Sequence, residues 1–275
     1  MTLKPVEPVL VADRFAEERE ALLRLLAGLS AADWQQPTVC PGWSVKDLAL
    51  HLLGDDLALL SRRRDGWSAL TVGAEGLVAA LNRWNEDWVA ATRRLSTPLI
   101  VELLGFSGPL VAAFFATLDP FASGGEVSWA GPGPQPVWLD TAREYTERWL
   151  HQQQIRDATQ SPALSEPRLF APVLATFVHA LPFAYRNVQA AAGTAINVSL
   201  RGESGGEWCL LREAGAWRLC AGSHDAPGAT VQLDQDLAWR LFTKGIVPVV
   251  ALQAARVAGD SELARPFFDA VAIIA

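Results

Sequence analysis

The sequence predicts an α+β protein in which a helical N-terminal part precedes a mixed C-terminal part. Residues 139–158 contain good helix formers and neither Gly nor Pro, which predicts a long helix. Between residues 194 and 233, short segments of alternating polarity are separated by Gly-Gly and Ala-Gly, which predicts strands joined by hairpin turns. Further helical segments follow these strands, and that order favours α+β over α/β.

The length and composition indicate more than one domain. A chain of 275 residues suits one large or two ordinary domains, and half of the residues are hydrophobic, enough for a sizeable core. The stretch from Ser161 to Pro167 has the Ser and Pro content of a linker, and the sequence pattern changes beyond it. We therefore expect two domains, residues 1–160 and residues 168–275.

Charge and cysteine content restrict the classes of partner. The net charge of −7 argues against nonspecific binding to nucleic acid. The three widely spaced cysteines form no C-x-x-C pair and suit a reducing compartment. The N-terminus lacks the apolar stretch of a signal peptide, and no apolar run approaches 18 residues. We expect a cytoplasmic monomer or homodimer that binds small molecules and neither nucleic acid nor a membrane.

Apolar residues at helical spacing predict the elements of the N-terminal domain. The second helix begins with Ser44 and Asp47, which match a capping box with Asp in place of Glu. Trp84 and Trp88 in the third helix are expected in the core, and Pro98 ends that helix. The predicted helices span residues 13–28, 44–64, 76–95 and 110–118, followed by a turn-rich loop and the helix 139–158.

The C-terminal domain is predicted to begin with a helix over residues 172–188 that is interrupted or kinked at Pro182. His179 lies in this apolar helix, so we expect a structural role for it, whereas His224 lies in a loop. The predicted strands span residues 194–201, 207–212, 216–221 and 230–233, and the predicted helices span residues 235–244, 247–258 and 262–274.

The long helix over residues 139–158 carries the first candidate for chemistry. Asp140 is placed to cap its N-terminus. Glu147 and His151 lie four residues apart, so they share one face of the helix, one turn apart. A carboxylate and an imidazole so placed can hold one divalent metal ion or form a surface hydrogen bond, and the spacing alone leaves both open.

His51 is the second candidate, two turns into the helix that begins at Ser44. It is flanked by Leu50, Leu52 and Leu53, and a buried histidine needs a polar partner. That partner is a backbone carbonyl in an ordinary core and a metal ion in a binding site.

Two motifs contain these candidates. The first reads W-x-x-P-T-x-C-P-G-W-S-x-x-D-x-x-x-H, and the second, about 100 residues later, reads E-x-x-x-H. Their residues are Trp34, Pro37, Thr38, Cys40, Pro41, Gly42, Trp43, Ser44, Asp47 and His51, then Glu147 and His151. Together they resemble the mycothiol-dependent maleylpyruvate isomerase family, which belongs to the DinB-like metal-binding four-helix bundles. The resemblance covers residues 1–160.

The resemblance implies a fold, a metal site and a cofactor. It implies a DinB-like four-helix bundle in which His51, Glu147 and His151 hold zinc or another divalent metal. It also implies a low-molecular-weight thiol such as mycothiol. Three protein ligands leave the ion an open position, and a thiol bound there is deprotonated by the metal. In the family the thiol adds to a small unsaturated acid, which isomerises from cis to trans, and relatives catalyse thiol S-transfer.

The C-terminal sequence VALQAARVAGDSELARPFFDAVAII, residues 250–274, resembles a sterol-carrier-protein domain. This resemblance implies a smaller α+β domain over residues 168–275. It also supports an alternative function, in which the protein contains a metal without catalysis and binds an apolar small molecule or lipid in this domain. A regulatory module that has lost its chemistry is a third reading, against which the intact metal motif counts.

Several other residues remain open. Cys40 is expected to belong to the turn before its helix rather than to act as a nucleophile. The motifs do not identify the catalytic or cofactor-binding residues, because the substrate-facing residues lie outside them. Arg156, Arg186 and Arg218 are unranked candidates for binding a substrate carboxylate. The run Gln152–Gln154 departs from the family, where another His or an acid is common, and leaves open which groups orient the metal ligands.

Overall fold

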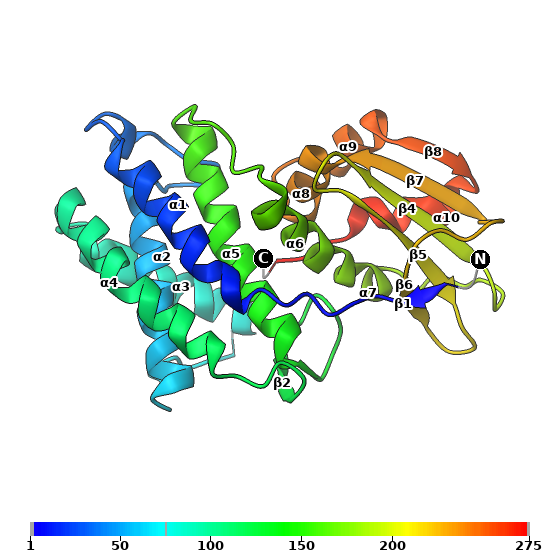
Figure 1. The fold of residues 1–275 in the computed structure, drawn as a ribbon, viewed down its shortest axis with the longest axis horizontal. Helices are drawn as coiled ribbons and strands as arrows, with labels where there is room; N and C mark the ends of the chain where they lie inside the picture. Colours follow the sequence, from blue (N-terminus) through cyan, green and yellow to red (C-terminus); the bar gives the residue numbers. More distant parts are fainter. Residues whose placement is uncertain (1–2, 75, 274–275) are drawn as a thin grey trace. The chain divides into compact units, whose positions relative to one another are not determined.

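The protein has the predicted α+β class (Figure 1). A computed structural model describes residues 3–74 and 76–273. Helices fill most of the first 160 residues, and the main sheet takes five of its six strands from residues 195–259. The segregation of helices and strands along the chain is what the sequence pattern predicted.

The chain packs into two compact units that interleave along the sequence. The first, called the helical unit, comprises Val11–Asp119 and Glu144–Leu164. The second, called the sheet unit, comprises Pro120–Arg143 together with the described residues before Val11 and from Ser165 on. The predicted domains, residues 1–160 and 168–275, remain a prediction of how the chain divides into independently folding parts.

The helical unit contains α1 to α4 and most of α5. Helices α1 and α2 both pack against α4, and α3 packs against α2. Buried leucines at helical spacing, such as Leu48 and Leu52 of α2, fill the space between the helices. The elements are η1 (Ala12–Arg14), α1 (Phe15–Ala27), η2 (Asp33–Gln35), α2 (Val45–Leu59), η3 (Leu60–Arg64), α3 (Gly76–Thr92), α4 (Thr97–Ala116) and α5 (Val137–Ala158).

The two tryptophans of α3 have different environments. Trp88 is half-buried, packs against Gly54 and donates its indole N–H to the Leu50 carbonyl at 2.8 Å. A Cβ on Gly54 would lie 2.6 Å from the Trp88 ring, so the glycine is needed for this contact. Trp84 is 37% exposed, and the prediction that it lies in the core is wrong. The apolar stripe of α3 is thus narrower than its sequence indicated.

Helix α4 is longer than predicted. It begins at Thr97 with Pro98 in its first turn, so the proline that ends the preceding helix also starts the next one. The predicted helix over residues 110–118 is only its second half. Pro109 lies inside α4, and its neighbour Gly108 packs on the Arg19 side chain so closely that a Cβ would lie 2.6 Å from Arg19 Cγ. This glycine lets Arg19 enter the core.

The sheet unit is built on a six-stranded sheet of order β1-β6-β5-β4-β7-β8. All neighbouring strands are antiparallel except β4 and β7, which are parallel. Its four central strands confirm the predicted strands to within a residue or so. The strands are β1 (Lys4–Pro5), β4 (Ala195–Arg201), β5 (Gly206–Arg212), β6 (Trp217–Ala221), β7 (Ala229–Asp234) and β8 (Arg256–Gly259), with a separate hairpin of β2 (Ser123–Glu126) and β3 (Pro134–Pro136).

The other elements of the sheet unit are short helices. The predicted helix 172–188 is interrupted just before Pro182, which lies in the first turn of α7, and the helix starts earlier than predicted, so that Pro172 lies inside α6. The short helices are α6 (Pro167–Phe177), η4 (Val178–Ala180), α7 (Leu181–Ala184), α8 (Gln235–Phe242), α9 (Pro248–Ala254), α10 (Ser261–Ala264) and η5 (Arg265–Asp269). The end of the last predicted helix, residues 262–274, lies partly outside the described residues.

Two predicted element boundaries are wrong. The predicted helix 247–258 ends early, and its last residues form β8, because they pair with β7 from Gly259 to Arg256. Asp140 does not cap α5, which begins three residues earlier at Val137; instead its carboxylate accepts hydrogen bonds from Arg143 at 2.7 and 3.2 Å. In the first case the pairing with a distant strand overrides the local helical pattern, and in the second the helix starts before the residue that was expected to cap it.

Two helical segments, Thr97–Ala116 and Pro167–Ala184, are long and apolar enough to cross a membrane by length and composition. The core helix of a soluble protein passes the same test. The expectations that the protein is cytoplasmic and has neither a membrane nor a nucleic acid as partner therefore stay predictions, as does its oligomeric state.

Candidate functional site

The first motif fixes where α2 begins. The Asp47 backbone N–H donates to Ser44 Oγ at 3.3 Å, and Asp47 Oδ2 accepts from the Ser44 backbone N–H at 2.9 Å. Both bonds of the predicted capping box are therefore present. Asp47 Oδ1 also accepts from Arg93 Nε at 2.9 Å, which ties the start of α2 to the end of α3. This fixed start places His51 on the second turn of α2.

The two motif histidines meet between α2 and α5 of the helical unit. His51 Nε2 lies 3.2 Å from His151 Nε2, and the two rings are nearly perpendicular, at 89°. Both side chains are buried. The structure thus brings together two imidazoles that lie 100 residues apart in the sequence.

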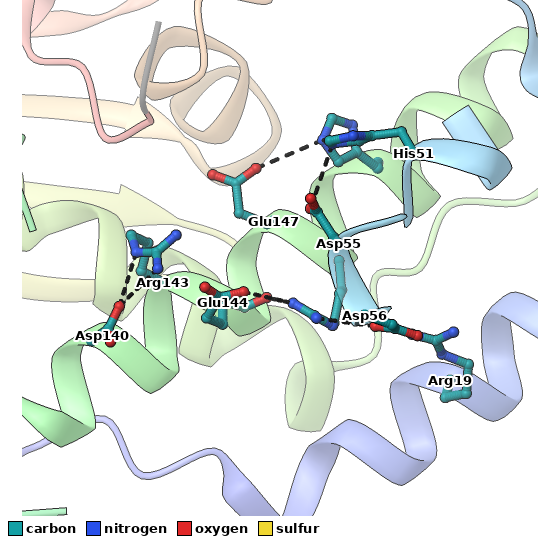
Figure 2. A network of polar contacts seen from close by, with 10 residues as sticks. Arg19, His51, Asp55, Asp56, Asp140, Arg143, Glu144 and Glu147 are labelled. Carbon is teal, nitrogen blue, oxygen red and sulfur yellow. Dashed lines mark hydrogen bonds and ion pairs between the residues drawn. The ribbon is translucent and has the colours of Figure 1, made fainter. Parts of the chain in front are cut away.

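A carboxylate flanks each imidazole, one helical turn away. On α5, Glu147 Oε2 lies 3.7 Å from His151 Nε2. On α2, Asp55 Oδ2 lies 3.5 Å from His51 Nε2. Figure 2 shows both carboxylates directed toward the imidazole pair. Asp55 is not part of either motif, although its spacing from His51 is the same i, i+4 signal that Glu147 and His151 carry.

Gln154 orients His151. Its Oε1 atom lies 2.8 Å from His151 Nδ1 and accepts a second hydrogen bond from Cys40 Sγ at 3.4 Å. A side-chain carbonyl can only accept, so His151 Nδ1 carries a proton and its Nε2 atom faces His51. The glutamine run that raised doubt therefore contains the group that orients His151.

The protein environment shifts the pKa values of the two imidazoles in opposite directions. Burial, together with the neighbouring His151 and Arg148, lowers the pKa of His51 to about 4, although Asp55 opposes the shift. Burial also acts to lower the pKa of His151, but Cys40, Glu147 and Gln154 outweigh it and raise that pKa to about 9. The pair therefore holds one proton beyond the neutral state, and it resides on His151.

A layer of buried ion pairs adjoins the histidines. Asp56, fully buried, accepts from Arg19 at 2.8 Å, Arg148 at 3.0 Å and Ser107 at 2.6 Å. Arg148 also pairs with Glu144 at 3.0 Å. Figure 2 shows this chain of contacts across α1, α2 and α5. It links α2 to α5 one residue away from Asp55 and from Glu147, and so fixes how the two helices are aligned at the site.

The donor set fits a metal ion in part. Two ligands on a tetrahedral zinc ion, each at about 2.0–2.1 Å, lie about 3.3 Å apart, close to the 3.2 Å between the two Nε2 atoms. As arranged, however, no group of three or more His, Cys, Asp or Glu side chains within residues 3–74 and 76–273 converges as a metal-ligand set. The two imidazoles therefore have the separation expected of two ligands on one ion, and the carboxylates lie beside them without converging on the same point.

The three candidate arginines make local contacts. Arg156 of the helical unit donates to the Pro162 carbonyl at 2.7 Å and to Gln152 Oε1 at 2.9 Å. In the sheet unit, Arg186 donates to the Phe183 carbonyl at 2.7 Å, and Arg218 pairs with Glu213 at 2.6 Å. None of these contacts marks one arginine over the others as a substrate ligand.

The remaining histidines lie in the sheet unit. His179 packs its ring against Trp138, with centroids 5.2 Å apart, and burial lowers its pKa to about 4. His224 Nδ1 accepts a hydrogen bond from the Ala226 backbone N–H at 3.2 Å, inside a loop. These contacts agree with the structural role expected for His179 and the loop position expected for His224.

Comparison with known proteins identifies relatives. Residues 15–156 match the family described as Mycothiol maleylpyruvate isomerase N-terminal domain. The uncharacterized protein Rv0036c of Mycobacterium tuberculosis (strain ATCC 25618 / H37Rv) is 29% identical over 221 residues, covering 78% of this chain and 81% of that protein. Both facts concern sequence and extend over most of the chain.

Solved structures give the same picture of the fold. The crystal structure of the mycothiol-dependent maleylpyruvate isomerase is similar with a TM-score of 0.51 at 12% identity, covering 84% of this chain and 86% of that one. A sterol carrier protein domain 2 of Helicoverpa armigera covers 36% of this chain and 84% of its own, with a TM-score of 0.29 and 16% identity. At 12% identity the likeness to the isomerase concerns the fold alone.

Proposed function

The chain belongs to the mycothiol maleylpyruvate isomerase N-terminal domain family, and from that premise we propose that it is a metal-dependent enzyme that uses a low-molecular-weight thiol. Its reaction is thiol addition to a small unsaturated acid with cis–trans isomerisation, or thiol S-transfer. The observation that supports this most is the pair of facing imidazoles, His51 and His151, whose Nε2 atoms are 3.2 Å apart.

In this proposal His51, His151 and Glu147 hold a divalent ion, with zinc as the first candidate because imidazole and carboxylate are among its usual ligands. The Glu147 side chain is 20% exposed, so it retains room to change its torsion angles. When bound, the ion supplies positive charge that lowers the pKa of a thiol and makes its sulfur a nucleophile.

The protein's own residues prepare this site. Gln154 keeps the proton of His151 on Nδ1 by accepting it at 2.8 Å, which leaves Nε2 as the ligand atom. The leucines around His51 are buried and exclude water from the imidazoles. The Cys40 hydrogen bond goes to Gln154, on the Nδ1 side of His151. In this proposal the reacting thiol is a molecule from outside the chain, as the family suggests.

Metal analysis of the purified full-length protein tests the proposal. We expect about one ion per chain in the wild type, and loss of most of it in His151→Ala with the helical content of the protein unchanged. Asp87→Asn, which removes one charge from the exposed side of α3, is the matched control and should keep the metal. Full metal occupancy in His151→Ala would contradict the assignment.

Turnover gives the second half of the test. The metal-loaded wild type should convert small cis-unsaturated acids, or transfer a thiol to an electrophile, only when a low-molecular-weight thiol is added. His151→Ala should lose this activity, and Asp87→Asn should keep it. Thiol-independent turnover would exclude the thiol-dependent mechanism even if the metal site stands.

A further inference from the structure

Helix α4 is apolar around its whole circumference. Glu102 is its one charged residue, and only 33% of its most apolar 18-residue window is buried inside the protein. A helix in the outer layer of a bundle normally carries polar residues on its solvent side. An apolar helix face that remains uncovered is therefore a candidate interaction surface.

The buried face of α4 is fixed by its contacts within the helical unit. Ser107 Oγ donates a hydrogen bond to Asp56 Oδ2 at 2.6 Å, and Gly108 packs against the Arg19 side chain. These contacts hold α4 against α1 and α2. The helix cannot turn its other face inward without breaking them, so the exposed face is a stable feature of the molecule.

The exposed face has large side chains in its first half and small ones in its second half. Leu99 and Phe106 are 38% and 67% exposed, and the exposed positions after them are Pro109, Ala113 and Ala116. Successive members of this set, called the α4 face, are three, four or seven residues apart, so they share one side of the helix. An antiparallel copy of the helix would lay its large half against the small half, which makes the α4 face complementary in shape to itself.

We propose that the α4 face binds the α4 face of a second copy of this chain, with the two helices antiparallel about a two-fold axis between Phe106 and Pro109. Each Phe106 then lies against Pro109 and Ala113 of the other copy, and each Leu99 lies near Ala116. The proposal is independent of the metal site, because it uses the side of α4 that faces away from α1 and α2.

The position of Glu102 favours a second copy over other occupants. In the antiparallel pair the two Glu102 carboxylates are separated by about 16 Å along the helices, at 1.5 Å per residue. A parallel pair would bring them together, and like charges that meet across an interface are costly. An anionic lipid surface would repel both this carboxylate and a chain of net charge −7, and α4 contains no Lys or Arg that would offset the repulsion.

The size of the α4 face suits a dimer in equilibrium with its monomers. The helix has 20 residues, which make it about 30 Å long. Contact along that whole length buries on the order of 1,000 Å² in total, the lower bound for a specific interface. We therefore expect a two-fold dimer, the commonest form of oligomer, that dissociates in the micromolar range.

Sedimentation equilibrium of the full-length protein at about 1–100 µM, the range in which a small interface dissociates, tests the proposal. The wild type should approach twice its chain mass of 29.7 kDa. Phe106→Glu places a charge at the centre of the α4 face and should raise the dissociation constant by at least about 100-fold. Phe121→Glu is the matched control, because Phe121 is also 67% exposed but lies outside α4, and it should remain dimeric. Circular dichroism checks that each variant is folded.

Crosslinking tests the direction of the helices. Leu99→Cys and Ala116→Cys are each made in Cys40→Ala, because Cys40 is partly exposed whereas Cys209 and Cys220 are buried. With a short bis-maleimide, a mixture of the two variants should give a crosslinked dimer, and neither variant alone should do so. Crosslinking of Leu99→Cys to itself would indicate a parallel pair and overturn the proposed arrangement.

Two further results would overturn the proposal. A dimer that persists in Phe106→Glu would have its interface elsewhere on the chain. A wild type that stays at 29.7 kDa over the whole range would exclude a second copy as the occupant. If that monomer sediments with phosphatidylcholine vesicles and Phe106→Glu does not, the α4 face binds a lipid surface instead.

Discussion

Two adjacent layers of polar side chains connect α2 to α5, and they differ in whether their charges are matched. In the ion-pair layer, the Asp56 carboxylate accepts hydrogen bonds from Arg19, Arg148 and Ser107, and Arg148 also forms an ion pair with Glu144. In the site layer, two carboxylates lie beside two imidazoles, and only His151 carries a positive charge there at neutral pH. The charges of the ion-pair layer are held in fixed pairs, although Arg19 Nε and Arg148 Nε have no hydrogen-bond partner among the described residues. The site layer is where we propose that a cation binds, so we assign stability and function to neighbouring residues of the same two helices.

The largest expected effect comes from breaking the ion-pair layer. Asp56→Ala leaves Arg19 and Arg148 buried without their shared carboxylate and should lower the free energy of unfolding by about 3–5 kcal/mol. Asp55→Ala, the next position on the same helix, should change that free energy of the metal-free protein by no more than about 0.5 kcal/mol. Urea denaturation followed by circular dichroism measures both. Equal losses in the two variants would show that the layers do not differ in this way.

The sheet unit offers a buried imidazole outside both layers. Burial lowers the pKa of His179 to about 4, while in the unfolded chain it is near 6.5. Between pH 4 and pH 6.5 His179 is protonated in the unfolded state but not in the folded state. The free energy of unfolding should therefore fall as the pH is lowered from 6.5 to 4, by about 1 kcal/mol per pH unit. His179→Phe keeps an aromatic ring against Trp138. In this variant the free energy of unfolding should depend less steeply on pH between 4 and 6.5. An unchanged slope would assign the pH dependence to other groups.

Within the site layer, Gln154 should affect metal binding through His151. Gln154→Ala removes the acceptor of the His151 Nδ1 proton and should weaken zinc binding by about 10–100-fold. Gln154→Glu, whose carboxylate can accept the same proton, should restore most of the affinity, which a merely structural role would not predict. Competition with a zinc indicator measures the affinity, and nitrogen NMR of the imidazole reports whether His151 keeps its proton on Nδ1. Equal zinc affinity in the wild type and in Gln154→Ala would show that Gln154 does not contribute to metal binding.

The parts of the fold that the sequence predicted are those with local signals. The capping box of Ser44 and Asp47 fixes the start of α2, and the i, i+4 spacing of Glu147 and His151 fixes their common face. Asp55 has the same i, i+4 spacing from His51, so the sequence alone contains this signal as well. By contrast, the contact of Gln154 with Cys40 joins residues 114 positions apart, which no local pattern encodes.

The wrong predictions have similar physical causes. Pro98 is compatible both with the end of one helix and with the first turn of the next, and only the end was predicted. The predicted helix 247–258 included residues 256–258, but their pairing with β7 makes them part of strand β8. The ion pair between Asp56 and Arg148 spans 92 residues, so the layer that aligns α2 with α5 is visible only in three dimensions.

The smallest expected effect concerns Cys40, which touches the site layer only through the hydrogen-bond network of His151. Its thiol contributes to raising the pKa of His151 to about 9, together with Glu147 and Gln154 and against burial. Cys40→Ala should therefore lower that pKa, so that at neutral pH a proton competes less with the metal for Nε2 and zinc binds slightly more tightly. Thiol-dependent turnover should persist in this variant, because the reacting sulfur comes from outside the chain. Zinc affinity and turnover of Cys40→Ala, with and without added thiol, are measured beside the wild type. An inactive Cys40→Ala together with a wild type that works without added thiol would make Cys40 the nucleophile. In that case the site layer would hold its own sulfur beside the metal, and the need for an external thiol would disappear.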